Sequence, residues 1–297
     1  MRRFIYLICG VEGLLVAVIA VVFDFDDTLA PDSTTQLLDA HGVDTDDLWS
    51  RRAPALVAEG YDPPLAYLRC LLDWVGPGRP LGELTNADLA AFGAELDASF
   101  FPGLPGLFGD LEAIAAAGRD VSVEFYIVSS GLQALIAGSG IVQRHLTGVY
   151  GCQLGENEAG HLAWVKRCVT FTEKTRFLFE INKGIGAAEA ATQPHLVNRR
   201  VPVGERRVPF EHMVFVGDGV TDIPCFSLVG DNGGTAFGVF DPSDSASAKR
   251  TFREFLRAGR VVSSHAPRFG PDDELGALLR AAVGEMVTRI EVRRARP

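Results

Sequence analysis

The most constraining feature of this sequence is an apolar run of β-branched and aromatic residues that stops at a group of acids. Residues 18–23 read Val-Ile-Ala-Val-Val-Phe, and Asp24, Asp26 and Asp27 follow at once. Such a run is typical of a strand buried on both faces, as in the centre of a parallel sheet. It therefore predicts a central strand whose carboxyl end bears carboxylates.

Apolar runs recur along the chain and alternate with helical patterns. Further strand patterns occur at 124–128, 213–216 and 235–239. This alternation predicts an α/β fold, a three-layer α/β/α Rossmann-like parallel sheet core, in which ligands bind beyond the carboxyl ends of the strands. We therefore expect Asp24, Ser129 and Asp218, which each follow such a run, to meet there. The intervening helices are predicted at 105–117, 131–138, 173–186 and 221–229.

Two segments interrupt the alternation. Residues 31–100 show four helical patterns, near 33–41, 45–58, 63–75 and 86–98, but no strand pattern. Because the segment is too long for a loop, it predicts an inserted α-helical cap, with residues 16–30 and 101–297 forming the core. Residues 151–171 predict a β-hairpin, and residues 1–15 an N-terminal extension. The amphipathic stretch 273–292 is expected to pack on the domain or on a partner.

Charge and cysteine content limit the partners and the compartment. The chain has 297 residues and a net charge of −10, so no overall positive field attracts nucleic acid or an anionic membrane. Its five cysteines form no C-x-x-C pair, which predicts reduced thiols in a cytoplasmic protein.

The N-terminus resembles a signal sequence, because Arg2 and Arg3 precede an apolar stretch broken only by Glu12 and two glycines. If residues 18–23 form a core strand, the remainder falls short of the roughly 20 residues that a membrane span needs. We therefore predict a cytoplasmic chain without membrane contact. The alternative is a protein that is membrane-anchored or exported through residues 1–20.

Three carboxylates are predicted to gather at one edge of the sheet. Asp24 and Asp26 flank Phe25, and Asp218 lies in a second group, Gly217-Asp218-Gly219-Val220-Thr221-Asp222. Like charges in a low-dielectric site repel one another and call for a cation. Hard oxygen ligands of this kind suit Mg²⁺, which also binds substrate phosphates.

These motifs resemble those of the haloacid dehalogenase superfamily. Asp24-Phe-Asp-Asp-Thr-Leu29 is similar to its first motif, Ser129-Ser-Gly131 to its second and Gly217-Asp-Gly-Val-Thr-Asp222 to its fourth, in the required order. The layout is closest to phosphoserine phosphatases, including the position of the helical cap after the first motif. The resemblance implies Asp24 as the nucleophile that becomes an aspartyl-phosphate, and Asp26 as the general acid and base.

The resemblance also implies the ligands of metal and phosphate. Magnesium would be held by the Asp24 side chain, the main-chain carbonyl of Asp26 and Asp218, with Asp222 a direct ligand or a support for one. Ser129, Ser130 and Gly131, at the start of a helix, would bind the phosphoryl oxygens.

The third motif of the superfamily is a lysine, for which the sequence offers two candidates. Lys174 lies near the start of a predicted helix, as in phosphoserine-phosphatase-like members. Lys183 precedes Gly184 and fits the C-terminal end of that helix, where a cation is favourable. We favour Lys174, and Lys183 stays open.

The predicted function is a magnesium-dependent phosphatase, a phosphoric monoester hydrolase acting on a small phosphorylated metabolite. The resemblance implies that Asp26 excludes dehalogenation, because dehalogenases of this superfamily lack the second aspartate: a halide needs no proton on leaving, whereas the oxygen of a phosphoester does. A phosphomutase or phosphotransferase, or a catalytically silent binding protein of the same fold, remains as an alternative. Phosphoserine phosphatases bind the substrate amine through a glutamate where this chain has Ser33, next to Asp32, so the sequence leaves the substrate open, and it leaves the oligomeric state open as well.

Overall fold

The computed structural model describes residues 16–295, and its centre is a seven-stranded sheet in the order β4-β3-β2-β1-β5-β6-β7. All neighbouring strands are parallel except β3 and β4. The predicted α/β fold is confirmed. The strands are β1 (Ala17–Phe23), β2 (Val121–Leu132), β3 (Gly148–Glu156), β4 (Leu162–Arg167), β5 (Met213–Gly217), β6 (Thr235–Val239) and β7 (Ser263–His265).

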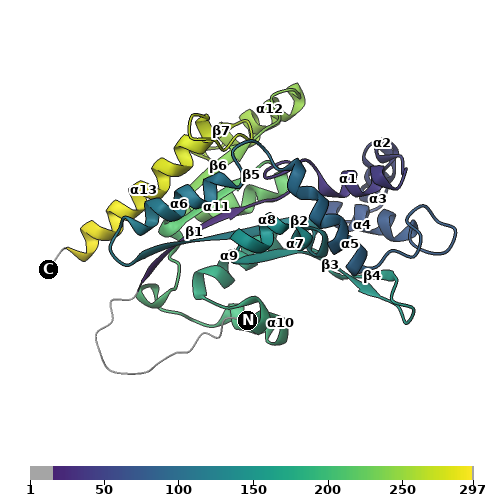
Figure 1. Cartoon of the computed structure of the whole chain (residues 1–297), viewed down its shortest axis with the longest axis horizontal. Coiled ribbons are helices and arrows are strands. Elements are labelled where there is room, and N and C mark those ends of the chain that lie inside the picture. Colours follow the sequence, from purple (N-terminus) through teal and green to yellow (C-terminus); the bar gives the residue numbers. More distant parts are fainter. Residues whose placement is uncertain (1–15, 296–297) are drawn as a thin grey trace.

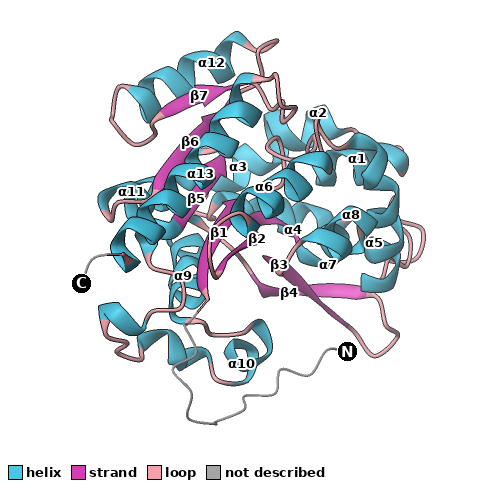
Figure 2. Cartoon of the chain, turned by 60° about the vertical axis from the view of Figure 1, so that its left-hand side comes forward, coloured by secondary structure: helices cyan, strands magenta, loops and turns pink. Residues whose placement is uncertain are grey.

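Helices cover both faces of the sheet, which gives the three predicted layers (Figures 1 and 2). On one face α6 packs against α13, so the amphipathic C-terminal stretch lies on its own domain. On the other face α9 packs against α11. These four helices span Gly106–Ala116 (α6), Phe171–Lys183 (α9), Ile223–Asp231 (α11) and Glu274–Arg294 (α13).

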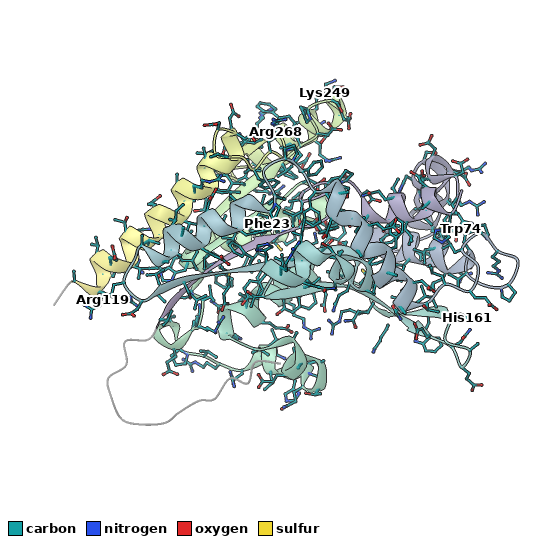
Figure 3. The ribbon with its side chains drawn as sticks, in the orientation of Figure 1. Phe23, Trp74, Arg119, His161, Lys249 and Arg268 are labelled. Atoms are coloured by element: carbon teal, nitrogen blue, oxygen red, sulfur yellow. The ribbon has the colours of Figure 1, made fainter. Side chains whose placement is uncertain are left out.

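The apolar run that ends at Asp24 forms the central strand β1. Ile19 to Phe23 are completely buried, as expected for a strand with neighbours on both sides and helices on both faces. Phe23 lies near the middle of the molecule (Figure 3). It packs edge-on against Phe108 of α6 and against Phe269, with ring centroids 6.2 and 6.3 Å apart. This packing fixes the end of the strand from which Asp24 emerges.

Residues 31–100 of the described chain form helices joined by turns and loops, the longest between residues 74 and 85, and contain no strand. Asp32 is the N-cap residue of the first helix, where its carboxylate accepts a hydrogen bond from the Thr35 amide. The elements are α1 (Ser33–Ala40), α2 (Thr45–Asp47), η1 (Leu48–Arg52), α3 (Ala53–Ala58), α4 (Pro63–Asp73), α5 (Asn86–Gly93) and η2 (Ala94–Ser99).

The cap docks on the core through the predicted hairpin of β3 and β4. The Glu156 carboxylate accepts a hydrogen bond from the Asn86 amide at 2.7 Å, and the Leu162 amide donates to the Leu84 carbonyl at 2.9 Å. Beside the hairpin, α5 packs against α7 (Gln133–Gly138) so closely that a Cβ on Gly93 would lie 2.0 Å from a backbone oxygen. These contacts hold the cap over the carboxyl edge of the sheet.

Two features differ from the sequence prediction. The helix expected from residue 131 begins at Gln133, because residues 129–132 still belong to β2, where its register with β3 shifts. Strand β7 was not expected, since Ser263-Ser264-His265 has no apolar pattern, yet it pairs with the edge of β6. The remaining elements are α8 (Gly140–His145), α10 (Ala187–Thr192), η3 (Pro194–Asn198), η4 (Val203–Glu205), η5 (Phe210–His212), η6 (Val220–Asp222), α12 (Ser245–Thr251) and η7 (Phe252–Leu256).

The predicted N-terminal extension, residues 1–15, lies outside the described residues. Export or anchoring through residues 1–20 falls largely on that segment, although residues 17–20 belong to β1. Across residues 16–295 no helix combines the length and the apolar character needed to cross a bilayer. The cytoplasmic location stays a prediction.

Candidate active site

The turn after β1 places Asp24 at the carboxyl edge of the sheet. Its amide donates to the Val216 carbonyl of β5 at 2.8 Å, and its carboxylate oxygen Oδ1 accepts from the Phe25 amide at 2.7 Å. The chain then turns back sharply, with Asp27 at a φ of 56°, a conformation that is uncommon for residues other than glycine. Such strain is typical of functional sites.

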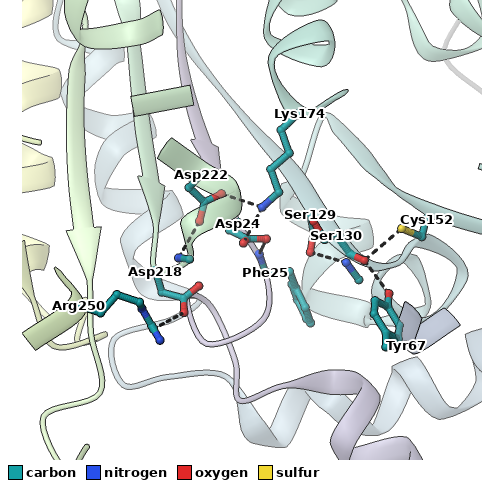
Figure 4. A network of polar contacts seen from close by, with 12 residues as sticks. Asp24, Phe25, Tyr67, Ser129, Ser130, Cys152, Lys174, Asp218, Asp222 and Arg250 are labelled. Atoms are coloured by element: carbon teal, nitrogen blue, oxygen red, sulfur yellow. Dashed lines mark hydrogen bonds and ion pairs between the residues drawn. The ribbon is translucent and has the colours of Figure 1, made fainter. Parts of the chain in front are cut away.

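Lys174, near the start of α9, is completely buried beside Asp24. Its Nζ lies 2.7 Å from Asp24 Oδ2 and 2.7 Å from Asp222 Oδ1 (Figure 4). Burial alone lowers the pKa of this amine, but the two carboxylates outweigh it and raise the pKa, so Lys174 stays charged. Lys183 instead donates to the Val197 carbonyl near the other end of α9. The structure thus brings Lys174, and not Lys183, to Asp24.

Asp24, Asp218 and Asp222 form a group in which one carboxylate oxygen from each residue lies within 4.8 Å of the other two. Octahedral Mg²⁺ binds oxygens at about 2.0–2.1 Å, so opposite ligands are about 4 Å apart and the group fits such an ion. Burial, and next the Asp24 charge, raise the pKa of Asp218 well above its usual value. Lys174 supplies only one positive charge to the three acids, and a divalent cation would balance the remainder.

The two oxygens of Asp222 already have protein partners. One accepts from Lys174, and the other accepts from the Gly219 amide at 3.0 Å. This arrangement favours the supporting alternative for Asp222: it orients Lys174 and the loop that carries Asp218, while Asp24 and Asp218 keep oxygens for a metal.

The side chain of Asp26 contacts the start of α1 and lies beside Gly131. Its Oδ1 accepts from the Ser33 amide at 2.7 Å, and its Oδ2 lies where a Cβ on Gly131 would come within 2.3 Å. Burial, and next the charge of Asp32, raise the pKa of Asp26 well above its usual value. A protonated Asp26 can donate to a leaving oxygen, whereas its backbone carbonyl is the group expected at the metal.

Ser129, Ser130 and Gly131 face Asp24 from the neighbouring strand β2. The Ser129 hydroxyl accepts from the Gly131 amide at 3.0 Å, and the Ser130 hydroxyl oxygen is buried with no partner among the described residues. The Ser130 carbonyl accepts from the Tyr67 hydroxyl at 2.6 Å and from the Cys152 thiol at 3.1 Å (Figure 4). Cap and core therefore both hold this segment in place.

A cavity of about 230 Å³ opens over these groups. Its floor contains the site residues of the core, and its opposite wall is built by the cap. Two other acids that line the cavity have raised pKa values, mainly because they are buried: the pKa of Asp32 is raised, and that of Asp27 is raised to about 6. The core contributes Asp24, Asp26, Asp27, Ser129, Ser130, Gly131, Asp218, Gly219 and Thr221, and the cap contributes Asp32, Thr34, Trp49, Pro63, Pro64 and Tyr67.

The sequence is similar to that of one curated protein. An uncharacterized protein from Borreliella burgdorferi is 31% identical over 236 residues, which is 71% of this chain and 78% of the relative. The two proteins belong to one family. No protein-family model matches the sequence.

Two solved structures share the architecture. A HAD family hydrolase from Salmonella enterica serovar Typhi superposes with a TM-score of 0.51 at 15% identity, covering 86% of this chain and 69% of the other. A probable phosphoserine phosphatase from Vibrio cholerae gives 0.53 at 14% identity, covering 92% and 67%. The chain has the haloacid dehalogenase fold. The predicted resemblance to this superfamily and to its phosphoserine-phosphatase-like members is confirmed at the level of the fold.

Within this haloacid dehalogenase fold, the core residues predicted for the site all lie around one cavity or directly behind it. The sequence reasoning missed the cap residues Trp49 and Tyr67, together with Cys152 on β3. No spacing rule identifies such residues, because their position depends on how the cap helices pack on the core. The Asp32 carboxylate, next to Ser33, lines the cavity, whereas Ser33 is buried behind it.

Proposed function

We propose that this chain is a magnesium-dependent phosphatase that hydrolyses a small phosphomonoester through an aspartyl-phosphate on Asp24. The observation that supports this most strongly is the double contact of buried Lys174, 2.7 Å from both Asp24 and Asp222, beneath a cavity that Asp26 also lines. A nucleophilic carboxylate, a fixed cation and a separate carboxyl with a raised pKa are the groups that phosphoryl transfer to and from a carboxylate needs. The fold, shared with a HAD family hydrolase, agrees with this chemistry.

In the first step an Asp24 oxygen attacks phosphorus, and the bond between phosphorus and the leaving oxygen breaks. Lys174 offsets the charge of Asp24, so that the approaching anionic ester is not repelled. Asp26 gives its proton to the leaving alcohol oxygen. Hydrogen bonds from Ser129 and Ser130 would hold the phosphoryl oxygens during transfer.

In the second step Asp26, now a carboxylate, removes a proton from water. The resulting hydroxide displaces phosphate from Asp24 and restores both carboxyl groups to their initial states. When bound by Asp24, the Asp26 carbonyl and Asp218, Mg²⁺ supplies positive charge for the phosphoryl oxygens. The cap forms one wall of the cavity, which favours small, soluble phosphorylated metabolites over phosphoproteins.

The test is release of p-nitrophenol from p-nitrophenyl phosphate by purified protein, with Mg²⁺ and with EDTA. We expect turnover that requires Mg²⁺ and is lost in Asp24→Asn, a variant of nearly the same shape. Activity that survives either change would refute the proposed function. A phosphomutase would convert a phosphorylated substrate to its isomer with little free phosphate, and a silent binding protein would bind Mg²⁺ without any turnover.

A further inference from the structure

Two cysteines lie opposite each other at the base of the β3–β4 hairpin, beside the active site. Gln153 of β3 pairs with Arg167 of β4 in an antiparallel register. Cys152 and Cys168 therefore occupy the next pair of opposed positions. Opposed residues of antiparallel strands have Cα atoms about 4.5–5.5 Å apart. A disulfide needs Cα atoms about 4.4–6.8 Å apart, so the backbone of the hairpin can accept one at this pair.

The side chains of Cys152 and Cys168 are thiols that contact each other. A hydrogen bond between them lowers the pKa of Cys152, despite the burial of that thiol, and raises the pKa of Cys168. The Val169 amide, which donates to Cys152 Sγ at 3.2 Å, lowers the pKa of Cys152 further. Because the thiolate is the nucleophile in disulfide exchange, Cys152 is the better nucleophile. Cys168 is only partly buried and is the sulfur that a reagent reaches first.

Cys152 also contacts the segment that we propose to bind phosphate. Its thiol donates to the Ser130 carbonyl at 3.1 Å, and the Tyr67 hydroxyl donates to the same carbonyl at 2.6 Å (Figure 4). The neighbouring strands are packed so closely here that a Cβ on Gly151 would lie 2.9 Å from the carbonyl oxygen of Gly131. A chemical change at the Cys152 sulfur therefore acts directly on the phosphate-binding segment.

We propose that Cys152 and Cys168 are an oxidation site, where a reversible disulfide forms and lowers the activity of the enzyme. In the disulfide neither sulfur carries a proton, so the Ser130 carbonyl loses one of its two donors and keeps the Tyr67 hydroxyl. The effect on activity rests on the proposed phosphatase function, whereas formation of the bond does not. In reducing compartments protein disulfides are usually transient, and many of them are redox-sensing.

The oxidant is a low-molecular-weight disulfide, and the reaction is thiol–disulfide exchange. The Cys168 sulfur attacks one sulfur of the reagent, the S–S bond of the reagent breaks, and the released half takes up the Cys168 proton. The Cys152 sulfur then attacks the Cys168 sulfur of the mixed disulfide. A bond forms between the two cysteines, and the second half of the reagent leaves with the Cys152 proton. The two cysteines are oxidised by two electrons, and the reagent is reduced to two thiols.

The experiment incubates the purified full chain in glutathione buffers with an increasing oxidised fraction. One sample is blocked with iodoacetamide and its peptides are mapped by mass spectrometry, and a second is assayed with p-nitrophenyl phosphate and Mg²⁺. We expect a peptide in which Cys152 and Cys168 are linked. We also expect kcat/KM to fall roughly two- to tenfold, the factor that one neutral hydrogen bond contributes. Dithiothreitol should reverse both changes.

Variants assign the effect to this pair of cysteines. Cys168→Ser and Cys168→Ala both remove the partly exposed thiol, and each should keep the activity of the reduced wild type in every buffer. In the matched controls, Cys9→Ser and Cys70→Ser, the same change is made at cysteines that the inference leaves out. Both controls should respond to oxidised glutathione as the wild type does.

The outcomes separate this inference from the proposed function. Cysteines 152 and 168 that stay unlinked in fully oxidised glutathione overturn the inference and leave the phosphatase intact. Linked cysteines with an unchanged kcat/KM, or a loss of activity that persists in both Cys168 variants, overturn the effect on the phosphate-binding segment. If the reduced protein hydrolyses no ester, the proposed function fails, and the peptide map alone decides whether the oxidation site exists.

Discussion

Replacement of Lys174 by methionine should destabilise the protein as well as inactivate it. Methionine matches the length of the lysine stem but leaves the Asp24 and Asp222 carboxylates, each 2.7 Å from the former charge, without their cation. Both carboxylates and Lys174 are buried. Removing one partner of a buried ion pair costs about 3–5 kcal/mol, because the remaining charge is left uncompensated.

The assay is thermal unfolding followed by circular dichroism in EDTA, so that a metal does not replace the missing charge. One kcal/mol shifts Tm by about 2–4 °C for domains of 150–250 residues, so Lys174→Met should unfold roughly 6–20 °C below the wild type. Its kcat on p-nitrophenyl phosphate, measured where the variant is still folded, should fall by about 10²-fold or more.

Lys183→Met is the matched control on the same helix. Lys183 is half-buried, donates to the Val197 carbonyl and lies 5.8 Å from the centre of the Phe179 ring. Its loss should lower stability by about 1 kcal/mol and leave kcat unchanged. The reasoning fails if Lys174→Met unfolds at the wild-type temperature, or if Lys183→Met shows the larger loss of activity.

Three further substitutions probe other parts of the structure. Gly131→Ala should lower kcat at least tenfold with an unchanged far-UV spectrum, because its Cβ would come within 2.3 Å of Asp26 and displace that carboxyl; wild-type kcat would contradict this. Gly109→Ala, exposed in α6 with no atom near the new Cβ, should raise the free energy of unfolding by about 0.5–1 kcal/mol in urea titrations, and a loss would be the contrary result. Burial alone would raise the pKa of Glu124, but hydrogen bonds from Arg207 outweigh burial and lower it. The ion pair therefore stabilises the folded protein above the unfolded pKa of about 4.3, and this contribution is lost as the pH falls through the folded pKa. Glu124→Gln should therefore lower the free energy of unfolding by about 1 kcal/mol at pH 7, a small value because solvent screens this partly exposed pair, and should not change it in acid. The same difference in free energy of unfolding at both pH values would refute the pairing.

The core and its catalytic edge were predictable because each rests on a local pattern. The run 18–23 could be assigned from composition alone, since a strand buried on both faces tolerates no polar residue. Once its direction and that of residues 213–216 were fixed, the parallel sheet required Asp24 and Asp218 to be neighbours. In the structure one carboxylate oxygen of Asp24, one of Asp218 and one of Asp222 lie within 4.8 Å of one another.

Other features depended on tertiary contacts that leave no pattern in the sequence. Ser129 to Leu132 stay extended because β2 keeps pairing with β3 across a shifted register, so α7 begins later than expected. Strand β7 forms because the edge of β6 is available, not because Ser263 to His265 favour a strand. Trp49 and Tyr67 reach the cavity only through the packing of the cap helices, which propensity does not encode.

The central claim, that Asp24 accepts the phosphoryl group, is tested most directly by trapping the protein during turnover. Wild-type protein hydrolysing p-nitrophenyl phosphate with Mg²⁺ is quenched in acid, where acyl phosphates persist longest, and its peptides are analysed by mass spectrometry. We predict one added HPO₃ group, located on Asp24 and missing from Asp24→Asn. Phosphate release without a modified Asp24, or with the group on another residue, would contradict the mechanism.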